Sequence, residues 1–155
     1  MTFRITGLPL EIFAPLFGLD DAALAAHGAI RMAVDAKPGF PCRITLEDAE
    51  PGDTVLLLNH EHQSAPTPYR SAHAIFVNEA ATATQTIVDE VPDILRTRPI
   101  SLRAFDEGHR MIDADLAEGE MVETVIQRML ANPEVAYLQA HNARRGCYAA
   151  RVERG

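Results

Sequence analysis

The chain has 155 residues, a length that predicts a single domain spanning 1–155 with a hydrophobic core of its own. Hydrophobic residues make up 47% of the sequence and charged residues 23%, which excludes a disordered or coiled-coil chain. Fourteen Lys and Arg against 22 Asp and Glu give a net charge of −8, so we expect no nucleic acid and no anionic membrane surface as partner.

The compartment is predicted from cysteines and from the first residues. The chain has two cysteines, and Met1 is followed by Thr-Phe-Arg rather than by a basic and then apolar leader. Both features are typical of a cytoplasmic protein in a reducing compartment. The apolar runs, such as 55–58, are far shorter than the roughly 20 residues that span a bilayer, so no transmembrane segment is expected.

The first half of the chain predicts short strands and one short helix. Residues 3–6 alternate as a strand does, and Asp20 is a suitable N-cap for a helix over 21–26. Strands are expected near 29–35, 42–46, 54–60 and 73–78, with a rigid Pro-rich loop over 37–41. Residues 80–92 mix helix and strand formers, and we expect a loop with a helical turn.

The second half predicts a helix between two hairpins. Residues 100–105 alternate and can pair with 111–116, whereas 120–131 carry one apolar stripe ended by Asn132-Pro133. Residues 135–142 and 147–153 then flank a four-residue loop. The fold class that follows is α+β, a mainly antiparallel sheet with one long amphipathic helix at about 120–131 and short helices, ending in a β-hairpin.

The last hairpin places particular side chains together. Pairing Asn142 with Cys147 sets His141 opposite Tyr148 on one face and Ala140 opposite Ala149. The small alanines leave room above the sheet, either for the predicted helix or for a ligand.

Histidine and cysteine patterns leave several chemistries open. His60 and His62 have the spacing of a metal-binding His-x-His pair, or they hydrogen-bond the Pro-rich loop, and we predict no metal site. Cys42 and Cys147 are candidate nucleophiles, a redox pair or core residues. The sequence contains no Gly-rich phosphate loop, Gly-x-Ser-x-Gly elbow or His-Glu-x-x-His motif, which removes the best-marked nucleotide-binding, hydrolase and protease classes and leaves any cofactor unknown.

Arginines on predicted strands are unusual in an acidic chain. Arg43, Arg70, Arg103 and Arg151 all lie in or beside strands. They either converge on a small anionic ligand or pair internally with aspartates, whereas Arg144 and Arg145 are expected to be solvated in the hairpin loop.

Four groups of motifs carry a family resemblance. They are Pro38-Gly39-Phe40-Pro41-Cys42-Arg43, Pro68-Tyr69-Arg70 with Ala74-Ile75-Phe76-Val77, Ser101-Leu102-Arg103-Ala104-Phe105-Asp106, and His141-Asn142-Ala143 with Gly146-Cys147-Tyr148-Ala149-Ala150-Arg151-Val152. In this order, over almost the whole chain, they resemble the domain-of-unknown-function family numbered 1203. The resemblance implies a small bacterial single-domain protein and names no activity. Thr67 stands where the family often has Ser, and His60 lies outside these motifs.

We therefore predict a polar, arginine-containing pocket that binds a small anionic metabolite. The candidate ligand-binding residues are Cys42, Arg43, Arg70, Arg103 and Asn142, and the candidate catalytic residues are His141, Cys147 and Tyr69, with His141 available as acid or base. Two alternatives stay open. One is a homodimeric structural protein with a buried hydrogen-bond network, and the other is a thiol- or metal-dependent enzyme.

Overall fold

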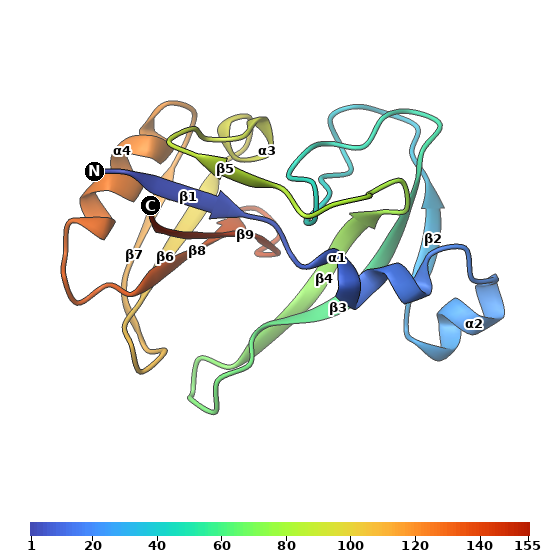
Figure 1. The fold of residues 1–155 in the computed structure, drawn as a ribbon, viewed down its shortest axis with the longest axis horizontal. Helices are drawn as coiled ribbons and strands as arrows, with labels where there is room; N and C mark the ends of the chain where they lie inside the picture. The colour runs from blue at the N-terminus through green and yellow to red at the C-terminus, as the bar shows by residue number, and fades with distance from the viewer.

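Nine strands form two antiparallel sheets in the computed structural model, which describes residues 1–155 (Figure 1). The six-stranded sheet has the order β5 (Thr86–Val88), β1 (Phe3–Thr6), β9 (Tyr148–Arg154), β8 (Tyr137–Asn142), β6 (Ile100–Phe105) and β7 (Met111–Ala117). The three-stranded sheet has the order β2 (Ile30–Ala33), β3 (Thr54–Gln63) and β4 (Ser71–Asn78). Every neighbouring pair of strands is antiparallel, which confirms the predicted antiparallel sheet.

The predicted α+β fold with one long amphipathic helix is wrong. The helices are α1 (Leu10–Phe13), the 3-10 turn η1 (Ala14–Leu16), α2 (Asp21–Ala26), α3 (Asp93–Arg96) and α4 (Met121–Leu130). The longest, α4, has only ten residues. Gly119 precedes it in the left-handed region with φ of +56°, and Asn132-Pro133 follows it. These residues limit the length of the helix at both ends. The chain is mostly antiparallel sheet with short helices.

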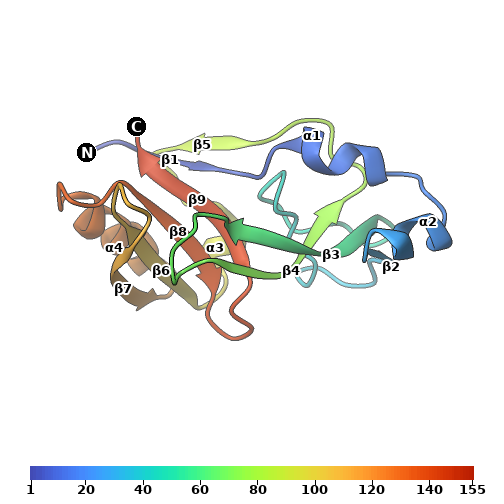
Figure 2. The same cartoon turned by 90° about the horizontal axis from the view of Figure 1, so that it is seen from below.

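The main core lies between one face of the large sheet and the helices α3 and α4 (Figure 2). It contains 21 buried residues, among them Ile5 and Leu102 from strands, Leu95 from α3 and Ile126 from α4. Each such side chain contributes about 1.5–3 kcal/mol of transfer free energy. This burial fixes one face of β8 and β9 and leaves their other face for polar residues.

A second core of 11 buried residues lies between the small sheet and the N-terminal helices. Leu56 and Ile75 from the strands pack there with Leu24 of α2, whose helix is capped as predicted, since Asp20 Oδ1 accepts from the Ala23 N–H at 2.8 Å. Tyr148 of β9 belongs to this second core although its strand is in the large sheet. The Tyr148 side chain thus packs the large sheet against the small one.

The chain crosses between the sheets at Gly7, directly after β1 (Figure 1). The Leu8 N–H donates to the Arg43 carbonyl at 2.7 Å, and a side chain at Gly7 would collide with the carbonyl of Ile44. Glycine is required there because only hydrogen fits. This close approach holds the segment that carries Arg43 against the N-terminal crossing.

Three local predictions fail for identifiable reasons. Residues 42–46 do not form a strand, because Leu46 turns the chain with φ of +59° and only single bridges form at Pro41 and Cys42. The predicted loop over 80–92 contains the edge strand β5. In the last hairpin His141 does face Tyr148, but a bulge sets Ala140 opposite Ala150 instead of Ala149.

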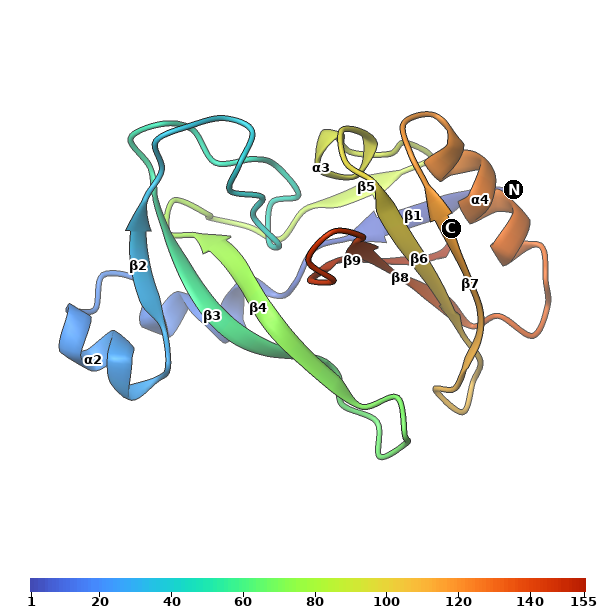
Figure 3. The same ribbon diagram turned by 180° about the vertical axis from the view of Figure 1, so that it is seen from behind.

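The ends of β3 and β4 extend as an arm beyond the small sheet (Figure 3). This arm reaches the polar face of the large sheet, where Gln63 Nε2 donates to the Tyr137 hydroxyl at 2.8 Å. A register shift between His60 and Gln63 interrupts the regular pairing of β3 with β4 in this arm. The polar face of β8 is therefore covered in part by residues of β3 and β4.

Candidate functional site

A cavity of about 600 Å³ opens beside the last hairpin. Four arginines line it, and we call it the arginine pocket. Its lining residues are Met32, Pro38, Gly39, Phe40, Pro41, Arg43, Phe76, Thr97, Arg98, Pro99, Asn142, Arg144, Arg145 and Cys147. They come from the Pro-rich loop, the small sheet, the segment after α3 and the β8–β9 loop, so the pocket lies where the two sheets meet.

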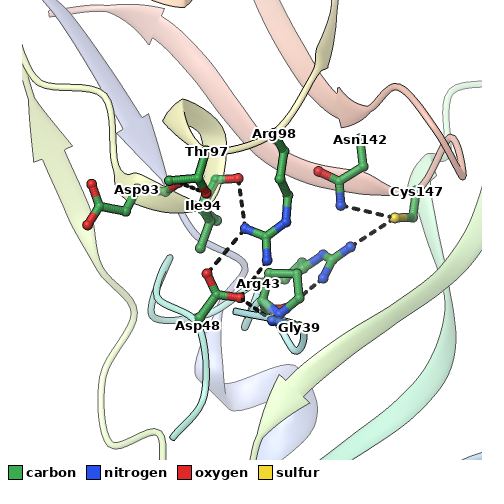
Figure 4. A network of polar contacts seen from close by, with 10 residues as sticks. Gly39, Arg43, Asp48, Asp93, Ile94, Thr97, Arg98, Asn142 and Cys147 are labelled. Carbon is green, nitrogen blue, oxygen red and sulfur yellow. Dashed lines mark hydrogen bonds and ion pairs between the residues drawn. The ribbon is translucent and has the colours of Figure 1, made fainter. Parts of the chain in front are cut away.

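Arg43 is the buried member of the pocket, with 1% of its surface exposed (Figure 4). Its Nε donates to the Tyr148 carbonyl at 2.8 Å and its NH1 to the Pro41 carbonyl at 2.6 Å, while NH2 donates to Cys147 Sγ at 3.1 Å. No carboxylate lies within ion-pair distance of this guanidinium. Burial lowers the pKa of Arg43, but a guanidinium stays charged in proteins.

Arg98 is the paired member of the pocket. Its NH1 and NH2 donate to the two carboxylate oxygens of Asp48 at 3.2 and 2.6 Å, a bidentate pair that is mostly buried (Figure 4). Asp48 Oδ1 also accepts from the Gly39 N–H at 3.3 Å. The pair therefore ties the segment after α3 to the Pro-rich loop on the opposite wall.

Arg144 and Arg145 lie at the rim of the pocket in the β8–β9 loop. Both are exposed, and neither has an acidic side chain within ion-pair distance. Gly146, with φ of +81°, completes the turn by donating its N–H to the Asn142 carbonyl. The turn geometry thus sets two unpaired cations beside Cys147.

Cys147 and Asn142 form the polar wall between these arginines. Cys147 Sγ accepts from Arg43 NH2 and from Asn142 Nδ2, the latter at 3.4 Å. Asn142 Oδ1 is buried and has no hydrogen-bond partner. A buried amide oxygen without a donor costs about 1–3 kcal/mol, so this atom is available to a ligand donor.

A second polar cluster occupies the other face of β8, and we call it the histidine face. It consists of His62, Ser71, Arg103, Gln139 and His141. Gln139 Oε1 lies 3.0 Å from His62 Nδ1 and 3.3 Å from His141 Nε2, while His62 Nε2 lies 3.2 Å from Ser71 Oγ. The imidazole rings of His62 and His141 meet edge to face at 4.7 Å between centroids.

His141 is fully buried on this face. Burial, and then the charge of Arg103, lowers the pKa of His141 to about 3, although its hydrogen bond to the Gly146 carbonyl at 3.0 Å opposes the shift. His141 is neutral at physiological pH. With the Nδ1 proton donated to Gly146, the neutral ring has no second proton for Gln139.

The comparisons with known proteins identify a family. Residues 39–154 match the family model described as "Protein of unknown function (DUF1203)". The chain belongs to the DUF1203 family. The match confirms the resemblance predicted from the motifs, and it includes every lining residue of the arginine pocket except Met32 and Pro38. The comparisons with curated proteins and with solved structures found no match for this DUF1203 chain.

The residues predicted as a single site are divided among four places in the DUF1203 chain. Arg43, Asn142 and Cys147 line the arginine pocket, and Arg103 and His141 lie on the histidine face. Tyr69 and Arg70 lie at the end of the β3–β4 arm, where Arg70 pairs with Glu61 at 3.0 Å, and Cys42 is fully buried in the second core. These eight residues therefore do not surround one cavity.

Three further arginines of the pocket had no place in the predicted site. Arg144 and Arg145 were expected to be solvated, yet they line the rim because the turn at Gly146 returns the loop to Cys147. Arg98 lies in no family motif quoted above. No motif in the sequence marks Arg98, because its ion pair with Asp48 joins segments that are distant in the chain.

Two other features are absent from the chain. No group of three or more His, Cys, Asp or Glu side chains in the DUF1203 chain is arranged to hold a metal ion. None of its helices is long and apolar enough to cross a membrane.

Proposed function

We propose that this protein binds a small anionic molecule in the arginine pocket. One observation carries the proposal. Four guanidinium groups line a single cavity, and Asp48 is their only carboxylate partner. The chain has 22 acidic residues, so pairing each of these arginines internally would have been easy. Three uncompensated positive charges around one cavity favour an anion as its occupant.

The chemistry of the lining indicates the class of ligand. A guanidinium donates two parallel hydrogen bonds to carboxylate or phosphate, and the cavity volume is in the range of small-molecule sites. Asn142 Oδ1 needs a donor. We therefore expect an organic carboxylate or phosphate that carries a hydroxyl or amino group close to its anionic group.

The four arginines have different tasks in this proposal. Arg43 supplies a fixed positive charge at the buried wall, and Arg98 is held rigid by Asp48. Arg144 and Arg145 make no ion pair with the protein, so they are free to contact the ligand at the rim. Preorganised charges bind better because less side-chain entropy is lost.

The rim provides a clean test. The double variant Arg144→Gln/Arg145→Gln removes two charges that make no ion pair or side-chain hydrogen bond within the protein, and Arg110→Gln is the control on a distant exposed arginine. Titration calorimetry with inorganic phosphate, citrate and malate is expected to show binding in the wild type and control. Each lost charge-assisted contact costs about 1.5–3 kcal/mol, so affinity should fall at least tenfold in the double variant. Equal affinity in all three proteins, or no binding by any of these anions, contradicts the proposal.

A second candidate function is nucleophilic chemistry by Cys147. Two donors, Arg43 NH2 and Asn142 Nδ2, contact its sulfur at the wall of the pocket, and thiol nucleophiles of enzymes lie beside such cationic groups. Iodoacetate, an anion, is expected to alkylate Cys147 faster than neutral iodoacetamide does, the reverse of their order with free cysteine. Mass spectrometry separates Cys147 from the fully buried Cys42. A thiol that reacts with neither reagent removes this candidate and leaves the anion proposal standing.

A further inference from the structure

Ser71, His62 and Gln139 form a linear hydrogen-bonded series across three strands, outside the arginine pocket. Ser71 Oγ lies 3.2 Å from His62 Nε2, and His62 Nδ1 lies 3.0 Å from Gln139 Oε1. The residues come from β4, β3 and β8, so the fold and not a local motif assembles them. A hydroxyl, an imidazole and an orienting acceptor in this order are the parts of a serine nucleophile with its base.

The orientation of Gln139 decides the tautomer of His62. Gln139 Nε2 donates to the main-chain carbonyl of His62 at 2.9 Å, so its Oε1 must be the atom that faces the ring. An amide oxygen only accepts, and His62 Nδ1 therefore carries the proton. The lone pair of Nε2 then points at Ser71, which is the state in which an imidazole accepts a proton from a hydroxyl.

The bulge in β3 supplies this geometry. His60 pairs with His73 and Gln63 with Ser71, and the register shift lies between them. The shift leaves His62 without a regular partner and aims its ring at Ser71 and at β8. Bulges that redirect one side chain are over-represented beside active sites.

Beside these three residues, the guanidinium of Arg103 has no acidic partner. Its Nε donates to Ser101 Oγ at 3.3 Å, and its two terminal nitrogens donate to no protein atom. No carboxylate lies within ion-pair distance of it. Arg103 is the partner of Gln139 in the register of β6 and β8, so its side chain lies on the same face as the amide that contacts His62. Ser71 itself is exposed, so a substrate can reach it.

We propose that Ser71, His62 and Gln139 are a hydrolytic site for small carboxylic esters that carry an anionic group, with Arg103 as the binding residue for that group. This site is separate from the arginine pocket and does not depend on the proposed function there. Ser71 and His62 are the catalytic residues, and Gln139 is a positioning residue.

The reaction needs only water as co-reactant. Ser71 Oγ bonds to the ester carbonyl carbon while its proton passes to His62 Nε2, and the tetrahedral adduct collapses as the carbon–oxygen bond to the alcohol breaks. His62 returns the proton to the departing alkoxide. Water then attacks the acyl carbon and gives a proton to His62, and the bond between the acyl carbon and Ser71 Oγ breaks. His62 returns that proton to Ser71 Oγ, so the carboxylic acid leaves and the hydroxyl is restored.

Serine hydrolases commonly orient the catalytic histidine with a carboxylate, whereas here the neutral amide of Gln139 contacts His62. Gln139 fixes the ring but stabilises the imidazolium less than a carboxylate does, so turnover is expected to be slow. Gln139→Leu should lower turnover, whereas Gln139→Glu should retain it and move the acidic limb of the pH–rate profile upward. The groups that face His62 in this readout are Ser71 and His73 on β4, Arg103 on β6, His141 on β8 and Tyr148 on β9.

The test compares hydrolysis of mono-4-nitrophenyl succinate with that of 4-nitrophenyl acetate by the full chain. The variants are Ser71→Ala, His62→Gln and Arg103→Gln, and Ser64→Ala is the matched control because Ser64 is exposed on the same arm. Loss of the base should lower turnover by about 100-fold or more, to the level of Ser71→Ala. Arg103→Gln should slow the succinate ester selectively.

Covalent labelling keeps the outcome decisive if a variant misfolds. A fluorophosphonate probe should phosphonylate Ser71 in the wild type, as located by mass spectrometry, and should leave Ser64 unmodified. Unlabelled Ser71, or ester hydrolysis that is unchanged in folded Ser71→Ala, overturns the proposal. Neither result bears on anion binding in the arginine pocket.

Discussion

Arg43 is the largest fully buried side chain of the protein, and it satisfies its donors without a carboxylate. Main-chain carbonyls of Pro41 and Tyr148 accept two of its hydrogen bonds, and the third goes to Cys147 Sγ. Neutral acceptors remove the cost of unpaired donors but leave the charge uncompensated. A buried cation without a carboxylate destabilises the fold unless an anion compensates its charge, which is why the proposed anionic ligand fits this residue.

The buried His141 predicts that the folded protein loses stability at acidic pH. Its pKa of about 3 in the folded protein lies below the value near 6.5 in the unfolded chain, so between these values only the unfolded chain binds the proton. Stability is therefore greatest above pH 6.5 and falls as pH decreases toward 3. At pH 5 the loss due to His141 is about 2 kcal/mol. His141→Gln should remove that part of the difference between urea unfolding at pH 7 and at pH 5.

The control for this prediction is His27→Gln, because His27 is exposed after α2. It should unfold with the pH dependence of the wild type. Burial lowers the pKa of His60 and His62 as well, so some acid sensitivity should remain in His141→Gln. An unchanged difference between pH 7 and pH 5 in His141→Gln would show that His141 is already charged in the folded protein.

Among the elements, Glu79 connects three segments just beyond β4. Its carboxylate accepts from Arg31 of β2 at 2.7 Å, from the Thr54 hydroxyl at 2.8 Å and from the Gly18 N–H at 2.9 Å. These donors come from the edge strand, the start of β3 and the turn before α2. The small sheet and its helices thus share one acceptor, which compensates for the shortness of β2.

Glu79→Gln tests this junction. The Arg31 hydrogen bond, more than any other contact, lowers the pKa of Glu79 from 4.5 to about 2. Because the folded pKa is depressed, the stabilisation is complete above pH 4.5 and is lost as pH falls through 2. With an allowance for solvent screening, we expect Glu79→Gln to cost about 2 kcal/mol at pH 7, measured by urea unfolding. Exposed Glu11→Gln is the control, and equal midpoints for the two variants would contradict the prediction.

Elements were predictable where a local pattern decided them. The strand pairs β6–β7 and β8–β9 follow from alternation and turn residues, and His141 faces Tyr148 because the loop length sets that pair. The bulge that sets Ala140 opposite Ala150 changes no turn residue and leaves no local signal. The edge strand β5 forms only because β1 offers it a free edge, which residues 80–92 cannot reveal by themselves.

The site was predictable only in part, for a related reason. Arg43, Asn142 and Cys147 were expected together, and two of them are neighbours through the last hairpin. The packing of the two sheets brings Arg98 to these residues. It also brings Ser71 and His62 to Gln139. Contacts between distant elements have no sequence period, so alternation and spacing do not report them.

For the whole molecule, the packing of the two sheets depends on Tyr148. Its main chain belongs to the large sheet, while its ring is buried in the core of the small sheet and stacks on His62 with 5.5 Å between centroids. Its carbonyl also accepts from Arg43. The arginine pocket and the histidine face lie on the two sides of this contact, so both proposed sites require the sheets to hold their relative position.

Tyr148→Ala should therefore weaken the whole chain and not one sheet alone. Loss of a buried aromatic ring costs about 3–5 kcal/mol, and Tyr148→Phe, which keeps the ring, should remain close to the wild type. If residues 1–155 are one cooperative domain, urea unfolding of Tyr148→Ala followed by far-UV circular dichroism and by tyrosine fluorescence should give one shared midpoint, shifted downward. Two separate midpoints would mean that each sheet unfolds together with its own core. The contact between the sheets at Tyr148, and not either core, would then set the geometry of both sites.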